Sequence, residues 1–374
     1  MSSNIKKKEK KSNFELLKIL AMLMIISFHY VYKSGYEPEI MNLKTLCIKT
    51  FWLLGEWGVN LFILITGYFM IKKEMSIKKI ILIIAEVFFY NLLNVFLSYY
   101  FLNISIEIRD IMFPVIYNRF WFISAYIIIY LLSPYINKFI ISMNKKELEK
   151  FLVVVLFIWS FIPTIFGLRF NSSETLLYYS RLIWLIIMYF IGAYIKLYDI
   201  KLLNNPEKSL LTAISCFAVM VISIVFMYQC RDIFNMIGTT EYAYLWTPNN
   251  IFMLALSVST FQFFAKLQIK PIKIINVLAS TTLGIYMLHD GCFNIFLWRV
   301  LFNTKLKLES TNFIFYIFGT TIVIFVIGAI FDLIRKVFEK FTINKILELE
   351  HFKRIISRIN SYVFSDKTIH EKQE

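Results

Sequence analysis

Long, uninterrupted apolar runs are the feature that most constrains how this chain can fold. A helix needs about 20 mostly apolar residues to cross a lipid bilayer, and runs of that length recur along nearly the whole sequence. Of the 374 residues, 58% are hydrophobic and only 17% are charged, whereas about a quarter of the residues in a soluble domain are charged. The polar segments between the runs are too short to bury cores of their own. The sequence therefore predicts an all-α, polytopic integral membrane protein.

Hydropathy divides the chain into a membrane domain with a polar tail on each side. Residues 1–13 are a basic tail, and residues 14–335 are expected to form one membrane domain of about ten transmembrane helices. Residues 336–374 carry apolar side chains at near-helical spacing among charged ones. That pattern predicts an amphipathic helix on the cytoplasmic surface, with membrane lipid as its partner. The ten transmembrane helices are expected at 14–32, 51–71, 80–101, 120–141, 151–167, 182–198, 209–229, 249–267, 274–298 and 312–334.

The distribution of positive charge predicts the orientation of these helices. With the N-terminus in the cytoplasm, 28 lysines and arginines lie on the cytoplasmic side and 11 on the outer side. Removing the nine in the C-terminal tail leaves 19 against 11, which has the same direction. Because cytoplasmic loops carry the excess of lysine and arginine, both termini are expected in the cytoplasm. The net charge of +15 then reflects topology, and no nucleic-acid partner is expected.

Two polar residues stand out in the first predicted helix, 14–32. Lys18 and His29 are eleven positions apart. At about 100° and 1.5 Å per residue, their side chains share one face and are separated by roughly 16 Å along the axis. Estimated depths place further polar side chains near each of them. The outer layer collects His29, Glu56, Arg119, His289 and Asp290, and the inner layer collects Lys18 and Glu86.

Each of these residues also has a purely structural interpretation. Lys18 could extend to the headgroups, Glu86 could only neutralise Lys18, and the two histidines could be polar caps near helix ends. Glu56 could face a water-filled vestibule. The functional interpretation rests on convergence, because ionisable side chains at membrane depth are costly and several helices place them in one layer. Metal binding is not expected, since the outer-layer residues offer no ligand pair at i, i+4 spacing.

Four stretches together resemble the acyltransferase-3 family of membrane-bound bacterial O-acyltransferases. They are KILAMLMIISFH (18–29), WGVNLFILITGYFM (57–70), RFWFISAYIIIYLLSPYIN (119–137) and LGIYMLHD (283–290). The resemblance covers nearly the whole chain in the number, order and orientation of its helices. One departure is that the family usually has arginine where this chain has Lys18. Lysine keeps the charge but is a point charge without the bidentate geometry of a guanidinium.

The resemblance implies transfer of an acyl group, usually acetyl, from cytoplasmic acyl-CoA to a hydroxyl of a cell-envelope glycan or related acceptor. The expected location is the bacterial plasma membrane, with acyl-CoA as donor substrate and no bound cofactor. The donor phosphates would lie near Lys18, Lys72 and Lys73. His29 would act as general base or carry the acyl group, and Glu56 would orient its ring. The expected substrate-binding residues are Arg119, Trp121, His289 and Asp290.

Two other functions fit the sequence. A transporter or exporter of a small molecule or glycan would also have many helices with polar residues at membrane depth, and it would work without acyl-CoA. An accessory membrane module for sensing or partner binding is the third interpretation. The acceptor and the length of the acyl chain are not fixed by any motif in the sequence.

Overall fold

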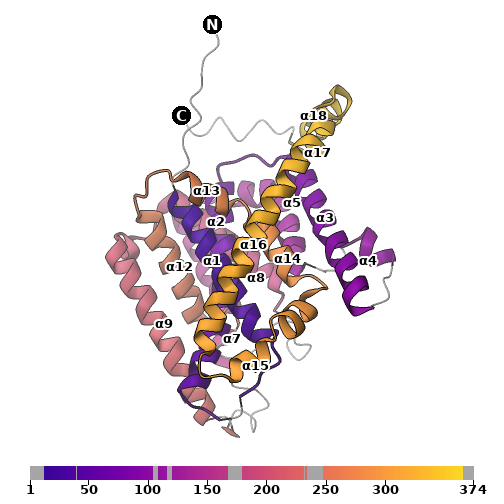
Figure 1. Ribbon diagram of the computed structural model, residues 1–374. Helices are drawn as coiled ribbons and strands as arrows, with labels where there is room; N and C mark the ends of the chain where they lie inside the picture. Colours follow the sequence, from indigo (N-terminus) through magenta and orange to yellow (C-terminus); the bar gives the residue numbers. More distant parts are fainter. Residues whose placement is uncertain are drawn as a thin grey trace.

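The fold is a bundle of long helices that stand roughly parallel to one another (Figure 1). The computed structural model describes residues 12–38, 40–103, 108–115, 120–166, 179–230, 232–233 and 247–364, and the regular elements within these ranges are all helical. Predicted all-α character is therefore confirmed. Helical structure is what a membrane demands, because backbone polar groups in hydrocarbon must be hydrogen-bonded within their own segment.

Eight helical segments in the described ranges are long and apolar enough to cross a membrane. Each coincides with one of the ten predicted spans, although several begin or end a few residues away from the predicted limits. They are α1 (Ser12–Tyr32), α2 (Leu43–Met70), α3 (Ile77–Leu102), α5 (Trp121–Ser142), the continuous segment of α6 (Lys145–Leu156), η1 (Phe157–Phe161) and α7 (Ile162–Phe166), α8 (Arg181–Tyr198), α9 (Pro206–Gln229), and the segment Phe313–Glu348, which comprises α16 (Phe313–Phe341) and α17 (Ile343–Glu348).

The predicted ninth span, 274–298, is wrong as a single helix. Its residues form α13 (Lys273–Ala279), α14 (Thr282–Asp290) and the beginning of η3 (Phe296–Leu301). The break after α13 has a local cause, because Ser280 and Thr281 turn their hydroxyls back to donate to the carbonyls of Val277 and Leu278. Such side-chain bonds compete with continuation of a helix. The predicted eighth span is α12 (Ile251–Lys266), which has only 16 residues.

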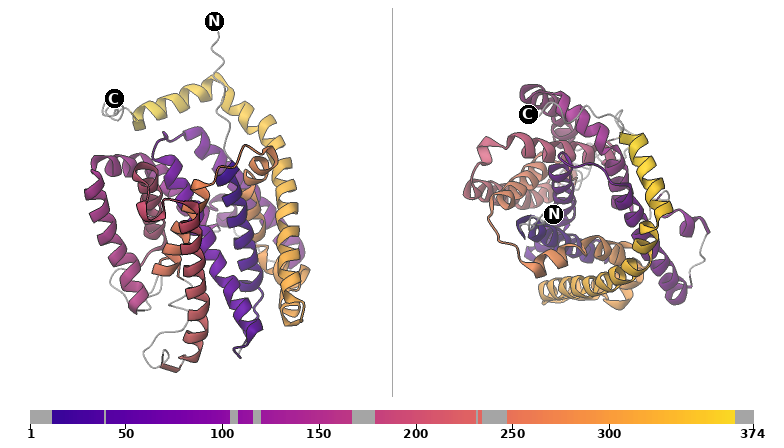
Figure 2. Two further views of the ribbon diagram at one scale, coloured as in Figure 1. Left: turned by 90° about the vertical axis from the view of Figure 1, so that its left-hand side faces the viewer. Right: turned by 90° about the horizontal axis from the view of Figure 1, so that it is seen from above.

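Short helices complete the described chain. After α16, the chain turns away from the axis of that helix, and α18 runs across one end of the bundle along its outer edge (Figure 2). These short helices are α4 (Ile108–Met112), η2 (Lys201–Leu203), α15 (Thr304–Glu309), α17 (Ile343–Glu348) and α18 (Glu350–Phe364).

Helix α1 is the central element, because it belongs to two hydrophobic clusters at once. On one side, Leu17 and Ala21 pack with residues of α2, α5, α8 and α12. On the other side, Ile26 and Tyr30 pack with residues of α3, α14 and α16. All four of these side chains are buried. The helix that carries Lys18 and His29 is therefore held from both sides, which fixes the direction of its polar face.

Helices α2 and α8 touch backbone to backbone at two glycines. A Cβ atom at Gly192 would lie 2.4 Å from the carbonyl oxygen of Leu64, and one at Gly67 would lie 2.2 Å from that of Tyr189. Small residues permit such contacts between membrane helices. The approach also brings Trp184 Nε1 within 3.0 Å of Asn60 Oδ1, to which it donates a hydrogen bond inside the bundle.

Replacing Gly192 with alanine should destabilise the protein by about 1–3 kcal/mol, because the added methyl group has no room at the α2–α8 contact. Gly319→Ala is the matched control, since nothing lies within 4 Å of a Cβ atom at Gly319. That substitution should leave stability unchanged or raise it by up to about 1 kcal/mol through helix propensity. Thermal unfolding of the two variants in the same detergent measures the difference. Equal midpoints would contradict the close packing described for α2 and α8.

Candidate functional site

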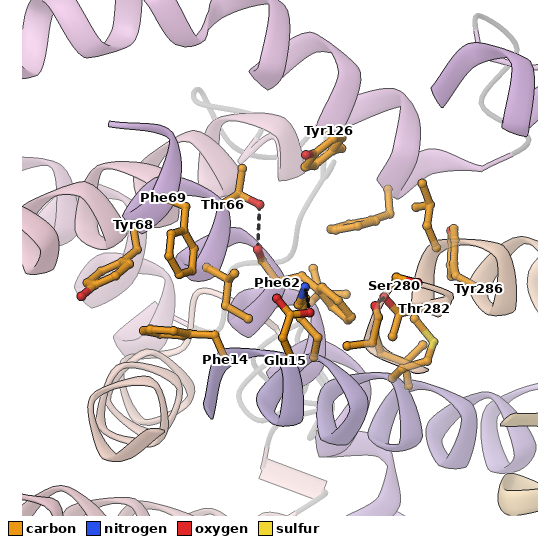
Figure 3. Close-up of a pocket in the computed structure, with 18 of the residues that line it drawn as sticks. Phe14, Glu15, Phe62, Thr66, Tyr68, Phe69, Tyr126, Ser280, Thr282 and Tyr286 are labelled. Carbon is orange, nitrogen blue, oxygen red and sulfur yellow. Dashed lines mark hydrogen bonds and ion pairs between the residues drawn. The ribbon is translucent and has the colours of Figure 1, made fainter. Parts of the chain in front are cut away.

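One cavity of about 1720 Å³ is lined by both polar residues of α1, Lys18 and His29. Figure 3 shows part of it, with Glu15 of α1 facing a space bordered by Thr66 of α2, Tyr126 of α5 and Tyr286 of α14. Its lining residues on α2 run from Trp52 to Met70, the last residue of that helix, so the cavity follows α1 and most of α2 through the bundle. The two side chains that the sequence predicted on one face thus border one continuous space.

His29 forms a hydrogen-bonded pair with His289 at one end of this cavity, here called the histidine end. His29 Nδ1 lies 3.0 Å from His289 Nε2, and His289 Nδ1 lies 2.6 Å from the carbonyl oxygen of Ile285. The two imidazoles come from α1 and α14, 260 residues apart in the chain. Both residues are buried, with exposed fractions of 7% and 0%.

The hydrogen-bond partners determine which nitrogen carries each proton. A carbonyl oxygen only accepts, so His289 Nδ1 must donate to Ile285, and Nε2 of the neutral His289 ring becomes an acceptor. His29 Nδ1 must then donate to His289. In a neutral His29 ring, the remaining nitrogen, Nε2, keeps its lone pair. The second histidine therefore prepares His29 Nε2 to accept a proton or to attack an electrophile.

A carboxylate and an ammonium group lie beyond that nitrogen. Asp290 Oδ1 is 3.7 Å from His29 Nε2, too far for a hydrogen bond but close enough to stabilise a positive charge on the ring. The same oxygen is 3.3 Å from Lys33 Nζ. His29, Lys33 and Asp290 all line the cavity. The sequence reasoning missed Lys33, although its position one helical turn after His29 could have indicated it.

Glu56 has a different partner from the one predicted. Its Oε1 lies 3.2 Å from Nη2 of Arg181, and Arg181 stacks 4.9 Å from the ring of Trp121. The prediction that Glu56 orients the His29 ring is therefore corrected, because His289 occupies Nδ1 of that ring and the guanidinium of Arg181 takes the carboxylate. Glu56, Trp121 and Arg181 line the cavity together. Arg119, a predicted substrate-binding residue, lies outside the described residues.

The opposite end of the cavity, here called the basic end, is rich in lysine. Of the three lysines predicted to hold the donor, Lys18 and Lys73 line the cavity, whereas Lys72 is exposed and is not among the described lining residues. The sequence reasoning missed the other three, since they resemble ordinary topology-setting residues at helix ends. The lysines of the basic end are Lys18, Lys73, Lys79, Lys196 and Lys266.

Two of these lysines are held in place by acidic partners. Lys18 Nζ lies 2.5 Å from Glu15 Oε2, one turn earlier on α1. Lys266 pairs with Asp199, which also accepts hydrogen bonds from Gln262 and from the backbone N–H of Ile200. Partial burial alone would raise the pKa of Asp199, but these donors outweigh it and hold the pKa below its ordinary value. Asp199 therefore stays ionised and fixes Lys266 beside the cavity.

Glu86 also lines the cavity, but its partner is not Lys18 as one interpretation predicted. Glu86 Oε1 lies 3.2 Å from Nη2 of Arg335, a buried residue of α16. The same guanidinium pairs with Asp332 at 2.7 Å and with Glu339. One arginine thus pairs with three carboxylates from α3 and α16. The hydroxyl of Tyr90 also donates a hydrogen bond of 2.9 Å to Asp332.

Comparisons with known proteins add one match. A protein-family model described as an acyltransferase domain, the acyltransferase-3 model, matches residues 11–331. Comparison with curated proteins and with solved structures found no match. The described part of the chain holds no group of three or more histidine, cysteine, aspartate or glutamate side chains that could bind a metal ion.

Arg335→Met should lower the free energy of unfolding by about 3–5 kcal/mol, because it leaves Glu86, Asp332 and Glu339 without their shared counter-ion in a buried site. Lys340→Met, on the same helix but exposed, should change it by less than about 0.5 kcal/mol. Thermal unfolding in one detergent measures both variants. Adding Glu86→Gln to Arg335→Met should recover part of the loss, and a double variant no more stable than the single one would count against the assigned pairing.

Proposed function

The chain belongs to the acyltransferase-3 family, and from that premise we propose that it transfers an acyl group, acetyl in the first instance, from acyl-CoA to a hydroxyl of a cell-envelope glycan or related acceptor. It is a membrane acyltransferase by family and by its long apolar helices. The donor, the acceptor and the roles of individual residues are parts of the proposal. Its expected place is the bacterial plasma membrane, with both termini and the basic end of the cavity in the cytoplasm.

One observation carries this proposal: a single cavity has lysines at one end and an imidazole with an available lone pair at the other. The two ends are roughly 16 Å apart along α1. An acyl-CoA molecule has the complementary arrangement, with phosphates at one end of a long, thin arm and a thioester at the other. Its phosphates would pair with Lys18, Lys73 and the other lysines of the basic end. The thioester would then extend towards His29.

The chemistry uses His29 Nε2. In direct transfer, Nε2 removes the proton of the acceptor hydroxyl while the oxygen attacks the thioester carbonyl. The carbon–sulfur bond then breaks, and the proton on Nε2 passes to the departing thiolate. In the covalent alternative, Nε2 attacks the thioester carbonyl and the carbon–sulfur bond breaks, so that CoA leaves as the thiolate. The acceptor hydroxyl then attacks the acyl carbon, the bond from that carbon to Nε2 breaks, and the hydroxyl proton is left on Nε2, from which it passes to the thiolate or to water. Both routes need the tautomer that His289 holds, and both place a transient positive charge on the ring near Asp290.

The remaining polar residues of the histidine end would position the acceptor. Trp121 offers an aromatic face, and the Glu56–Arg181 pair offers an acceptor and a donor of hydrogen bonds for hydroxyl groups. Glu56 Oε2 is buried and has no hydrogen-bond partner among the described residues, which a bound hydroxyl would supply. His289 and Asp290, predicted as substrate-binding residues, act in this proposal on His29.

A transporter or exporter of a small molecule or glycan is the second candidate. The observation that favours it is the same cavity, since its lining reaches from the first turns of α1 to the last. Such a protein would move its solute in the absence of acyl-CoA. The acyl-transfer proposal has the stronger support, because the family model that matches residues 11–331 is described as an acyltransferase domain.

His29→Ala should reduce transfer at least 100-fold, because removal of the base takes away a contribution of about 10²–10⁴ to the rate. Purified protein in sealed vesicles would receive acetyl-CoA labelled in the acetyl group and an envelope glycan extract, and the label on the glycan would be counted. His289→Gln should give an intermediate loss with a shifted pH profile, since the His29 ring survives but loses its partner. Equal transfer by wild type and His29→Ala would refute the role of His29, and solute uptake without any transfer would favour the transporter.

Lys18→Met should raise the KM for acetyl-CoA about tenfold with little change in kcat, because one charge-assisted contact to a phosphate is worth about 1.4 kcal/mol. Lys72→Met is the matched control and should change the KM less than twofold, since Lys72 is exposed and is not among the described lining residues. Lys18→Arg restores the residue usual in the family and should keep or improve activity. Initial rates at varied acetyl-CoA concentration test all three variants. An equal effect of Lys18→Met and Lys72→Met on the KM would contradict the assignment of Lys18 to the donor site.

A further inference from the structure

Helix α18 has an apolar face that the described part of the chain leaves partly exposed. Phe352, Ile355 and Ile359 are 38%, 39% and 39% exposed, and nearly every described side chain of the helix is exposed or half-buried. The helix touches the bundle mainly through its neighbours α17 and α3. An exposed apolar face on one helix is typical of a site of interaction with a membrane or another protein.

The two faces of α18 are chemically distinct. At about 100° per residue, Phe352, Ile355, Ile356 and Ile359 fall on one side, whereas Ser357 and Ser361 fall on the opposite side. Lys353 and Arg358 lie at the two borders between these sides. This arrangement, an apolar stripe with a basic residue on each flank and small polar residues behind, is typical of helices that lie in a membrane interface.

The position of α18 in the fold agrees with that arrangement. Helix α16 is one of the eight segments able to span the membrane, so its axis lies near the bilayer normal. The chain leaves α16 beside the basic residues Lys336, Lys340 and Lys345 and turns, and α18 then runs across the end of the bundle (Figure 2). A helix lying across the ends of the spans is close to the plane of the headgroups. In the view from above, α18 follows the outer edge of the bundle (Figure 2).

We propose that α18 is a membrane-docking helix whose apolar face inserts between lipids and whose basic flank binds the headgroups of anionic phospholipids. The charge of the helix favours anionic lipid as the partner, because three basic residues, Lys353, Arg354 and Arg358, stand against one acidic residue, Glu350. A negatively charged leaflet attracts such a segment by about 1 kcal/mol per basic residue near the surface. The proposal does not depend on acyl transfer, since it concerns a surface outside the cavity.

The test places a fluorophore on each face of α18 in the full-length protein. Single cysteines at Ile359 and at Ser357 would carry an environment-sensitive NBD label, and labelled protein without an added cysteine would supply the background from the four native cysteines. The proteins would be held in nanodiscs of phosphatidylcholine alone or with 30% phosphatidylglycerol, with brominated lipids as quenchers. In the anionic discs, the label at Ile359 should be blue-shifted and quenched at least twofold more than the label at Ser357.

A second variant tests the role of charge. Lys353→Glu with Arg358→Glu should remove the difference between the anionic and neutral discs, because the basic flank is reversed while the apolar face remains. Equal quenching at both label positions in anionic discs would overturn the proposal. So would a label at Ile359 that is shielded but not quenched by brominated lipid, since that result identifies a second copy or another protein as the occupant. Quenching that is equal with and without phosphatidylglycerol would overturn the preference for anionic lipid.

Discussion

The hydrogen bond between His29 and His289 is the interaction on which the candidate site depends. It exists because a polar side chain inside a bilayer must find its partner within the protein. His289 satisfies this requirement with a backbone carbonyl of its own helix, and that single bond then fixes the protons of both rings. The hydrogen bonds thus form a short relay from the Ile285 carbonyl through the imidazoles of His289 and His29, and it ends at Nε2 of His29. A carboxylate in the place of His289 would hold the same tautomer but would add a buried negative charge, whereas a neutral imidazole holds it without one.

The same requirement explains how the other charges of the bundle are arranged. Arg335 gathers three carboxylates around one guanidinium, and Arg181 and Lys266 each take one. The Arg335 side chain is only 5% exposed, and removal of one partner from such a buried group is far more costly than its net contribution to stability suggests. The pairs also join helices that are distant in sequence, since Glu86 lies on α3 and Arg335 on α16. Helix α1, which carries the reactive histidine, is packed on two sides by hydrophobic clusters.

Sequence reasoning could predict the features that depend on periodicity and length. The eight long helices, and the shared face of Lys18 and His29, follow from apolar run length and from 100° per residue, and both are seen in the fold. The pairing of polar side chains between helices could not be predicted, because it depends on the rotation of each helix about its axis. Depth alone placed Glu56 and His289 equally close to His29, and only the packing of α14 against α1 shows which of them reaches the ring. The break inside 274–298 was missed because two hydroxyl residues in an apolar run do not change its mean hydropathy, although their side chains end α13.

The arrangement at the histidine end bears on how an acyl group would be passed on. His29 is 7% exposed, and its only available nitrogen, Nε2, faces the cavity side where Asp290 and Lys33 lie. The donor and the acceptor must therefore both approach this one atom. In direct transfer, they must be present together, so the long cavity would hold the acyl-CoA arm from the basic end while the acceptor enters beside Trp121. In covalent transfer, the donor and the acceptor can bind one after the other, and the basic end need only be occupied during the first step.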